Sequence, residues 1–347
     1  MIDLRSDTAT RPTDGMRAAI AAAEVGDEQR REDPTVNELQ ERAATLLGQE
    51  RALFVPTATM ANQIALKLHA RPGDVLVAER HAHIVIYEYG GAAVHAGLMI
   101  EPIAGEGGRF GVDELHAATE PSTKGADQRA AVLALENTHN SSGGRCWPLE
   151  ELESLLAAAR ERGLATHLDG ARLFNAAVAT GVPASAIGGL FDTVTVCLSK
   201  GLGCPLGALL AGSEKTIERA WREKHLFGGA LRQAGIVAAA GVYALENHLD
   251  RLADDHARAR RLGDAWHAAG LPVEPDRVET NFVQLDVGVL GLGRDEVLAR
   301  LRQGGVGLSS TIHPTVVRAV THLDLGDDDI DRAIELVPHV LGARVAA

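Results

Sequence analysis

Short apolar runs alternate with amphipathic segments through the middle of the chain, and this order constrains the fold more than any other feature. The runs occupy residues 53–56, 75–78, 131–135, 164–168 and 193–198. Their length and aliphatic composition are typical of strands that are buried on both faces of a sheet. The clearest segment between them, residues 148–162, has leucines at helical spacing, a proline near its start and Gly163 after its end. The alternation predicts an α/β fold with a mainly parallel sheet covered by helices.

The sequence pattern changes towards the C-terminal part of the chain. A long charged helix begins near residue 250, and shorter strand candidates such as residues 281–287 follow it. A chain of 347 residues also exceeds the roughly 250–300 residues at which single hydrophobic cores stop growing. We therefore expect an N-terminal arm over residues 1–20, a large domain over residues 21–249 and a small C-terminal α+β domain over residues 250–347.

The chain is acidic, with a formal net charge of −13 at pH 7, and it contains no dense basic run. Nucleic acid and membrane surfaces are therefore not expected as partners. No stretch approaches the roughly 20 apolar residues of a membrane span, and the first residues lack the pattern of a signal peptide, so we expect a cytoplasmic protein. The 3 cysteines lack the spacing of a disulfide framework or a zinc site. We expect them to be free and buried.

Polar residues follow three neighbouring strands of the predicted sheet, at the point where each strand ends. They are Glu136, Asn137 and His139, then Asp169, Gly170 and Arg172, and finally Ser199, Lys200 and Gly201. In open α/β sheets ligands bind beyond the carboxyl ends of the strands, so we expect a functional site there. A lysine in that position loses part of its hydration, which favours the neutral amine that Schiff-base chemistry needs.

Lys200 and Asp169 together provide two anchors that pyridoxal 5'-phosphate (PLP) requires. The amine binds the aldehyde, and a carboxylate keeps the pyridine nitrogen protonated so that the ring can withdraw electrons. Each residue also has a simpler interpretation, since a lone lysine on a turn is usually solvated and Asp169 could cap the following helix. Thr57, Ala58 and Thr59 lie between a strand and a helix, where N–H groups and hydroxyls suit a phosphate.

Two histidines, His81 and His83, alternate directly after another predicted strand. This spacing could supply two metal ligands, but no third ligand is evident in the sequence, so we expect no metal ion. A planar imidazole that stacks on a cofactor ring is the sharper hypothesis for this segment.

Several segments of the chain resemble, in order, those of low-specificity L-threonine aldolases, a branch of the fold-type I PLP-dependent enzymes. The segments are DLRSDTATRP, EDPTVNELQ, ENTHN, HLDGARLFNA, LSKGLG, GGALRQAG and RAVTHLD. The combination of HLDGARLFNA with LSKGLG is highly specific, and the resemblance runs from residue 2 to the C-terminal region. It implies a PLP-dependent transferase-like fold in which the large domain binds PLP.

The resemblance implies a role at the cofactor for each candidate residue. Lys200 would form the Schiff base, Asp169 would meet the pyridine nitrogen, and His83 would stack on the ring. The other implied cofactor contacts are Thr57, Ala58, Thr59, Arg172 and Arg232. Arg232 would be offered by a neighbouring subunit, because the family is usually tetrameric, a dimer of dimers with shared active sites.

The resemblance also implies a substrate and a reaction. Ser6, Arg172 and Arg318 match the residues that bind the carboxylate of the amino-acid substrate, and the fork of an arginine suits such binding. The implied reaction is retro-aldol cleavage of L-threonine, L-allo-threonine and similar β-hydroxy-α-amino acids to glycine and an aldehyde. His139 matches a histidine near the substrate's β-hydroxyl. The proton of the β-hydroxyl would pass to His139, to His83 or to a water that they hold.

Three positions depart from the pattern of the family. Arg30 replaces an aromatic residue near the mouth of the site, and His225 stands where a lysine often accompanies Arg232. Both leave open an alternative reaction, either on bulkier phenylserine-type substrates or by β-elimination. Ala58 replaces a glycine in the phosphate turn, which is tolerable provided that residue 58 has a negative φ. A non-catalytic protein that binds PLP as a sensor is the more distant alternative, and the retained lysine, aspartate and arginines argue against it.

Overall fold

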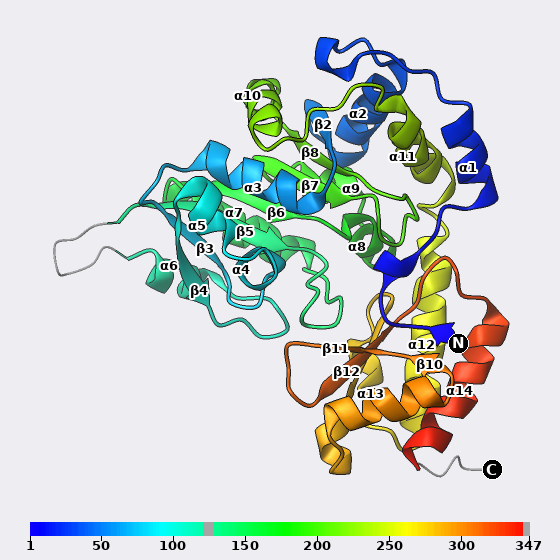
Figure 1. Cartoon of the computed structure of the whole chain (residues 1–347). Coiled ribbons are helices and arrows are strands. Elements are labelled where there is room, and N and C mark those ends of the chain that lie inside the picture. The colour runs from blue at the N-terminus through cyan, green and yellow to red at the C-terminus, as the bar shows by residue number, and fades with distance from the viewer. Residues whose placement is uncertain (121–127, 343–347) are drawn as a thin grey trace.

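A seven-stranded sheet forms the centre of the larger part of the molecule (Figure 1). The computed structural model describes residues 1–120 and 128–342. In spatial order the strands are β2 (Arg51–Val55), β8 (Ala208–Gly212), β7 (Thr193–Cys197), β6 (Ala165–Asp169), β5 (Ala130–Glu136), β3 (Val75–Glu79) and β4 (Met99–Ile103). Five neighbouring strands are parallel to one another, namely β7, β6, β5, β3 and β4. Strand β8 runs antiparallel to both of its neighbours, β2 and β7. This arrangement confirms the predicted α/β fold.

Helices cover both faces of this sheet, which explains why most residues of its inner strands are apolar. In β2, Leu53 and Val55 pack against α3 and α10, while Ala52 and Phe54 belong to the core on the opposite face. The helices of this part are α1 (Asp14–Ala21), α2 (Pro34–Leu47), α3 (Ala58–His69), α4 (His83–Ile86), α5 (Gly91–Ala96), α6 (Val112–Ala118), α7 (Leu149–Glu161), α8 (Leu173–Thr180), α9 (Ala184–Gly188), α10 (Glu214–Leu226) and α11 (Gly235–Asn247). Side chains alternate between the two faces of a strand, so a strand that is covered on both faces favours apolar residues at successive positions.

Helix α2 shows how local sequence sets the bounds of an element. The Asp33 side chain accepts a hydrogen bond from the Val36 N–H (3.0 Å), and Pro34 occupies the first helical position. Both features are favourable at a helix start, because the first N–H groups have no partner within the helix. Gly48 ends the helix with φ +65°, a conformation that glycine adopts without strain.

The C-terminal part of the chain has its own small sheets and its own core. It contains α12 (Leu252–Ala268), β9 (Phe282–Asp286), α13 (Arg294–Gln303), β10 (Val306–Gly307), β11 (Ser309–Ser310), β12 (Val316–Val320) and α14 (Asp327–Leu341). Strands β11, β12 and β9 form an antiparallel sheet, and Trp266 is fully buried in the cluster beneath it. The division of the chain at residue 250 stays a prediction. Residues 121–127 and 343–347, which belong to its large and small domains, lie outside the described residues.

The N-terminal arm connects the two parts of the molecule. Strand β1 (Ile2–Asp3) pairs in parallel with β10, and Ile2 and Leu4 join the C-terminal core. Helix α1 then packs against α11 on the large sheet's side (Figure 1). The segment between β1 and α1 therefore passes from one part to the other, and it does so at the candidate active site.

Five of the seven central strands coincide with the apolar runs of the sequence, and two were not predicted. Strand β4 is an edge strand with mostly exposed or half-exposed residues, so it carries little apolar signal. Strand β8 is antiparallel and is followed, rather than preceded, by a helix. It therefore falls outside the strand–helix–strand alternation on which the prediction was based.

Two further expectations concern cysteines and membrane spans. Cys146, Cys197 and Cys204 are free and buried, as predicted. Among the residues that the structure describes, no helix has both the length and the apolar content that a bilayer crossing requires.

Candidate active site

The predicted polar residues meet at the carboxyl ends of β5, β6 and β7. Glu136 and Asp169 are the last residues of β5 and β6 and lie opposite each other in the sheet register. Lys200 follows β7 in a turn, where the Gly203 N–H donates to its carbonyl oxygen (2.8 Å). Asp169 is buried and Lys200 is half-buried. Within the described part of the chain, the Lys200 amine forms no hydrogen bond or ion pair, so it is available to a ligand.

Two donors hold the Asp169 carboxyl group. Its Oδ1 accepts from the Ala171 N–H (3.2 Å), and its Oδ2 accepts from the Asn62 side-chain amide (2.8 Å). Asn62 lies on α3, on the face that packs against the sheet. Asp169 does not cap the following helix, because α8 begins at Leu173 with Arg172 as its N-cap and without a side-chain cap.

Helix α3 begins at the predicted phosphate turn. Thr57 caps the helix, and its hydroxyl accepts from the Met60 N–H (3.2 Å). The N–H groups of Ala58 and Thr59 have no acceptor among the described residues. Ala58 is the first helical residue and is not among the described non-glycine residues with positive φ, so the condition set for alanine here is met. The helix start can therefore donate two hydrogen bonds to an anion.

His83 is held at the rim of the site by two carboxyl groups. Its backbone N–H donates to Glu136 Oε2 (2.6 Å), and its Nδ1 lies 3.1 Å from Glu88 Oε1. Burial lowers the pKa of His83, but the hydrogen bond to Glu88 and the charges of Asp169 and Glu136 outweigh it and leave the pKa raised. The side chain is 30% exposed, so the other ring nitrogen, Nε2, can face a ligand.

His139, in contrast, is buried and both of its ring nitrogens are engaged. Nδ1 bonds to Ser142 Oγ (2.9 Å), and Nε2 lies 3.2 Å from Glu79 Oε2. The side chain is 1% exposed. Gly108, at φ +83°, presses against the ring, and a Cβ there would lie 2.2 Å from His139 Cγ. Direct contact between His139 and a substrate is a prediction that this geometry does not support.

The charge of His139 should make stability depend on pH. Burial lowers its pKa, but Glu136 and Glu79 raise it more, so the net shift is upward. A raised folded-state pKa adds stability that is complete below the unfolded value of about 6.5 and is lost as the pH rises through the folded value. We expect the melting temperature of the wild type to fall over this range and that of His139→Gln to fall less. Glu79→Gln should flatten the profile in the same way, and an unchanged slope in both variants would contradict the assignment.

The two predicted carboxylate-binding arginines have different surroundings. Arg172 is buried and forms a two-pronged ion pair with Asp7 through Nε and Nη2 (both 2.6 Å). Arg318 donates to Ser309 Oγ (3.1 Å) and to Asn140 Oδ1 (2.9 Å), and it forms no ion pair among the described residues. Arg318 is thus the one with an uncompensated charge, while the third nitrogen of Arg172, Nη1, makes only a long hydrogen bond to Asn140 Oδ1 (3.4 Å).

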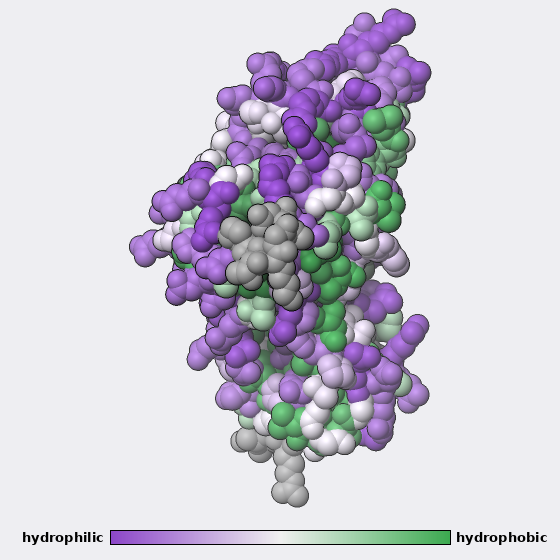
Figure 2. All heavy atoms as spheres, turned by 90° about the vertical axis from the view of Figure 1, so that its left-hand side faces the viewer, coloured by the Kyte–Doolittle hydropathy of each residue, from purple (hydrophilic) through white to green (hydrophobic). Residues whose placement is uncertain are grey.

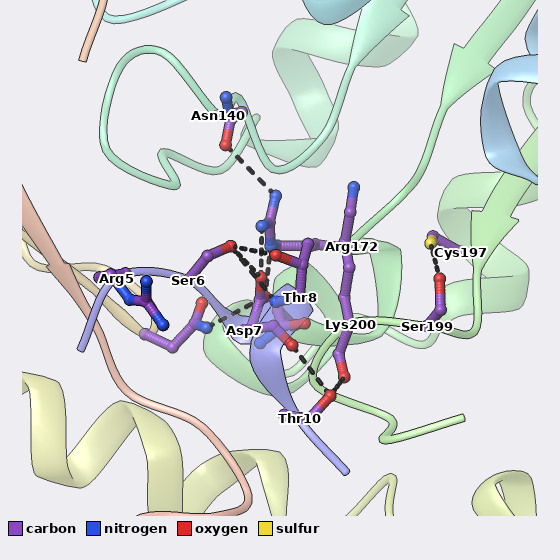
Figure 3. A network of polar contacts seen from close by, with 12 residues as sticks. Arg5, Ser6, Asp7, Thr8, Thr10, Asn140, Arg172, Cys197, Ser199 and Lys200 are labelled. Atoms are coloured by element: carbon purple, nitrogen blue, oxygen red, sulfur yellow. Dashed lines mark hydrogen bonds and ion pairs between the residues drawn. The ribbon is translucent and has the colours of Figure 1, made fainter. Parts of the chain in front are cut away.

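The N-terminal segment completes this side of the site (Figure 3). The Thr10 hydroxyl donates to the Lys200 carbonyl (2.7 Å), and the Ser6 hydroxyl accepts from the Thr8 N–H (3.2 Å) at the start of a short 3-10 helix. Ser6 therefore lies in the same group of polar contacts as the arginine with which it was predicted to act.

Arg232 lies apart from these residues. It forms an ion pair with Asp27 (3.1 Å), and its side chain is 63% exposed. Arg30 is also exposed and lies 3.9 Å from the same aspartate. The expected role of Arg232 in a neighbouring subunit's site stays a prediction.

Some residues of the site were missed by the sequence analysis. They are Asp7, Asn62, Glu79, Glu88 and Asn140, all of them buried. Asn62 had a sequence signal, because it is a polar residue on the apolar face of an amphipathic helix. The carboxylates had none, since their partners are far away in the chain and a single acidic residue is ordinarily solvated.

A family comparison agrees with this geometry. The family model described as beta-eliminating lyase matches residues 3–288. The chain belongs to the beta-eliminating lyase family. A relative from Escherichia coli (strain K12), named low specificity L-threonine aldolase, is 42% identical over 332 residues, which is 95% of this chain and 96% of the relative. The family resemblance of the sequence is thereby confirmed.

Two other members of the comparison extend this result. A relative from Arabidopsis thaliana, named low-specificity L-threonine aldolase 1, is 37% identical and the match covers 93% of each chain. The structure of a Leishmania major threonine aldolase superimposes with a TM-score of 0.83 over 98% of this chain and 99% of the other. Its sequence identity is 19%, so this likeness bears on the fold, which is that of the fold-type I enzymes.

Proposed function

We propose that the protein is a PLP-dependent aldehyde-lyase that cleaves L-threonine, L-allo-threonine and similar β-hydroxy-α-amino acids to glycine and an aldehyde. The observation that carries this proposal is a pair of residues at the ends of neighbouring strands: a Lys200 amine with no partner among the described residues, and a buried, doubly hydrogen-bonded Asp169. The names of the Escherichia coli and Arabidopsis relatives support the same reaction.

The residues of the site suit PLP in their chemistry. Lys200 supplies the amine for the aldehyde, Asp169 an acceptor for the protonated pyridine nitrogen, and the start of α3 two free N–H groups for the phosphate. His83, which is 30% exposed and lies near Asp169, is the residue that would stack on the ring. When bound, PLP supplies a pyridinium ring that takes up the electron pair released as the bond between Cα and Cβ breaks.

The chain's own residues would orient the substrate. Arg318 and the third nitrogen of Arg172 bind the substrate carboxylate with Ser6, while Asp7 and Asn140 fix the two guanidinium groups. A carboxylate held at two points cannot rotate freely. This restraint selects which bond of Cα stands perpendicular to the ring and therefore breaks.

We assign the proton of the β-hydroxyl to His83. Its Nδ1 faces Glu88, which accepts a hydrogen bond and thereby orients the ring, and Nε2 is left to the substrate. The Nδ1 of His139 bonds to Ser142, its Nε2 lies 3.2 Å from Glu79 without forming a hydrogen bond, and the side chain is only 1% exposed. Glu136 accepts the hydrogen bond of the His83 backbone N–H, and His139 Nε2 lies 3.9 Å from the same carboxyl group. We therefore expect Glu136 and His139 to position His83.

Product analysis with four substrates tests the proposed reaction. Protein reconstituted with PLP should release glycine and acetaldehyde from L-threonine and from L-allo-threonine, and benzaldehyde from phenylserine. L-Serine should yield little pyruvate. Pyruvate and ammonia from serine without aldehyde from threonine would instead support β-elimination, and no turnover of any substrate would support the sensor alternative.

Arg318 should be the arginine most sensitive to substitution in substrate binding. Arg318→Lys retains the charge but loses the fork, and a hydrogen bond to a charged group contributes about 1.5–3 kcal/mol. We expect KM for threonine to rise about 10–100-fold with a much smaller change in kcat. Arg300→Lys, on the exposed face of α13, is the matched control. An unchanged KM in Arg318→Lys would remove this residue from the carboxylate site.

We further propose that the chain assembles with copies of itself, as a dimer of dimers. Exposed apolar side chains include Tyr89, Val94, Met99 and Leu226, and hydrophobic residues gather along one side of the face shown in Figure 2. Arg232 is exposed and could reach a neighbouring copy's site. Light scattering of the holoenzyme would give the mass, and a monomer would contradict this part of the proposal.

We also propose that the protein is located in the cytoplasm. Its three free cysteines suit that reducing compartment.

A further inference from the structure

A line of polar side chains runs between helix α3 and the sheet, starting at Asp169. Asn62 and His69 lie about two turns apart on the face of α3 that meets the sheet, and His167 and Thr193 lie below them on β6 and β7. Asn62, His167 and Thr193 are 1%, 0% and 0% exposed, respectively. Most of the other side chains in this layer are aliphatic, so these polar groups depend on one another for hydrogen bonds.

The distances make this line continuous. Asn62 Nδ2 donates to Asp169 Oδ2 (2.8 Å) and to Glu88 Oε1 (2.9 Å), and Asn62 Oδ1 lies 3.1 Å from His167 Nε2. His167 Nδ1 lies 2.9 Å from Thr193 Oγ1, which lies 2.9 Å from His69 Nε2. Four side chains therefore link the carboxyl group at the candidate cofactor site to the far end of α3.

The chemistry of the groups fixes the direction of each bond. Carboxylates only accept, so the Asn62 nitrogen must face them and its oxygen must face His167. His167 then donates from Nε2 and, being neutral, accepts at Nδ1 from the Thr193 hydroxyl. Burial lowers the pKa of His167 to about 4, which agrees with a neutral ring. Thr193 in turn accepts from His69, so every donor has one acceptor.

We propose that Asn62, His167 and Thr193 are positioning residues for PLP, which fix the Asp169 carboxyl group in the orientation that binds the pyridine nitrogen. This inference rests on the proposed function and deepens it. An asparagine amide can rotate by half a turn and present oxygen in place of nitrogen. His167 opposes that rotation, because its Nε2–H needs the Asn62 oxygen, and the Thr193 hydroxyl supports this tautomer of His167 by donating to Nδ1.

The same Asn62 amide also binds Glu88, the residue that orients His83. One amide group thus holds the two carboxyl groups that serve the ring nitrogen and the stacked imidazole. A purely structural role in the core would need neither of these two contacts, since an apolar residue at position 62 would continue the aliphatic face of α3.

An analogue of the cofactor separates a positioning role from a structural one. 1-Deaza-PLP keeps the aldehyde and the phosphate but has carbon in place of the pyridine nitrogen, so it makes no hydrogen bond with Asp169. We would measure the Kd of PLP and of 1-deaza-PLP by spectral titration of the apoprotein for the wild type and for Thr193→Val. This substitution keeps the side-chain shape and removes only the hydroxyl.

We expect Thr193→Val to weaken PLP binding about 3–10-fold, the effect of one hydrogen bond, and to leave the Kd of 1-deaza-PLP unchanged. Asn62→Leu should weaken PLP binding more, and it should weaken the analogue less than PLP, because it also removes the contact to Glu88 behind the stacked His83. Thr166→Val is the matched control. Thr166 precedes His167 on β6, and its buried hydroxyl bonds to Asp192 (2.9 Å) and not to the line of side chains that leads to Asp169. It should alter neither Kd, even if it lowers the melting temperature.

The outcomes are distinguishable. Equal losses for PLP and the analogue in Thr193→Val, or no loss for either, would overturn the positioning role. A wild-type protein that binds neither compound would instead refute the proposed function. A wild type that binds PLP no better than 1-deaza-PLP would show that Asp169 does not act on the ring nitrogen, and the inference would then fall while Lys200 kept its role.

Discussion

Lys200→Ala is expected to lower threonine cleavage by roughly 10⁴-fold or more, the scale on which the loss of a covalent catalytic group acts in other enzymes. The lysine amine is the only part of the proposed cofactor site that can form a covalent bond to PLP. The variant should therefore lose the yellow absorbance of the protein–PLP adduct and its sensitivity to borohydride. The fold should survive, since Lys200 is half-buried and its amine has no partner within the described residues.

Two other lysines make this prediction specific. Lys215→Ala, on the exposed surface of α10, is the control and should retain absorbance and activity. Lys224 is fully buried in an ion pair with Glu28, and its amine is not available to an aldehyde. If borohydride still attached PLP to the Lys200→Ala variant, peptide mapping would identify the lysine, and the assignment of Lys200 would be refuted.

The sequence predicted the residues whose chemistry depends on local position. Asp169 and Lys200 each follow an apolar run, and Thr57 lies between a run and a helix, so the α/β pattern alone placed them near one edge of the sheet. The same logic missed β8, because an antiparallel strand joined by a short loop leaves no trace in a strand–helix alternation.

The missing part of the site consists of contacts between residues that are distant in the chain. Asp7 meets Arg172, and Glu79 meets His139, only after the N-terminal arm and the sheet have assembled. Nothing in the neighbourhood of Asp7 in the sequence indicates burial. His139 followed a predicted strand and was expected at the substrate. The loop at Gly108 closes over it, and that loop carried no signal that could have shown this.

Asp7→Asn is expected to have the largest effect on stability. Asp7 and Arg172 are both buried, at 0% and 6% exposure, and the carboxylate accepts two hydrogen bonds of 2.6 Å from the guanidinium. Burial raises the pKa of Asp7, but the charge of Arg172 and its hydrogen bonds hold the pKa far below the usual range. The amide of asparagine would leave the guanidinium charge buried without a counter-charge. Breaking a buried pair in this way costs about 3–5 kcal/mol of unfolding free energy.

Urea unfolding at a fixed protein concentration would measure this loss against a surface pair of the same geometry. Glu218 binds Arg31 with two hydrogen bonds of 2.7 Å, but both side chains are about half-exposed (54% and 51%). Glu218→Gln should therefore cost only about 0–1 kcal/mol. The double variant Asp7→Leu/Arg172→Met should recover much of the loss, because apolar groups of similar volume replace both buried charges. If Asp7→Asn were no more destabilising than Glu218→Gln, the contribution of the arm to the fold would have to come from β1, Ile2 and Leu4 instead of from this ion pair.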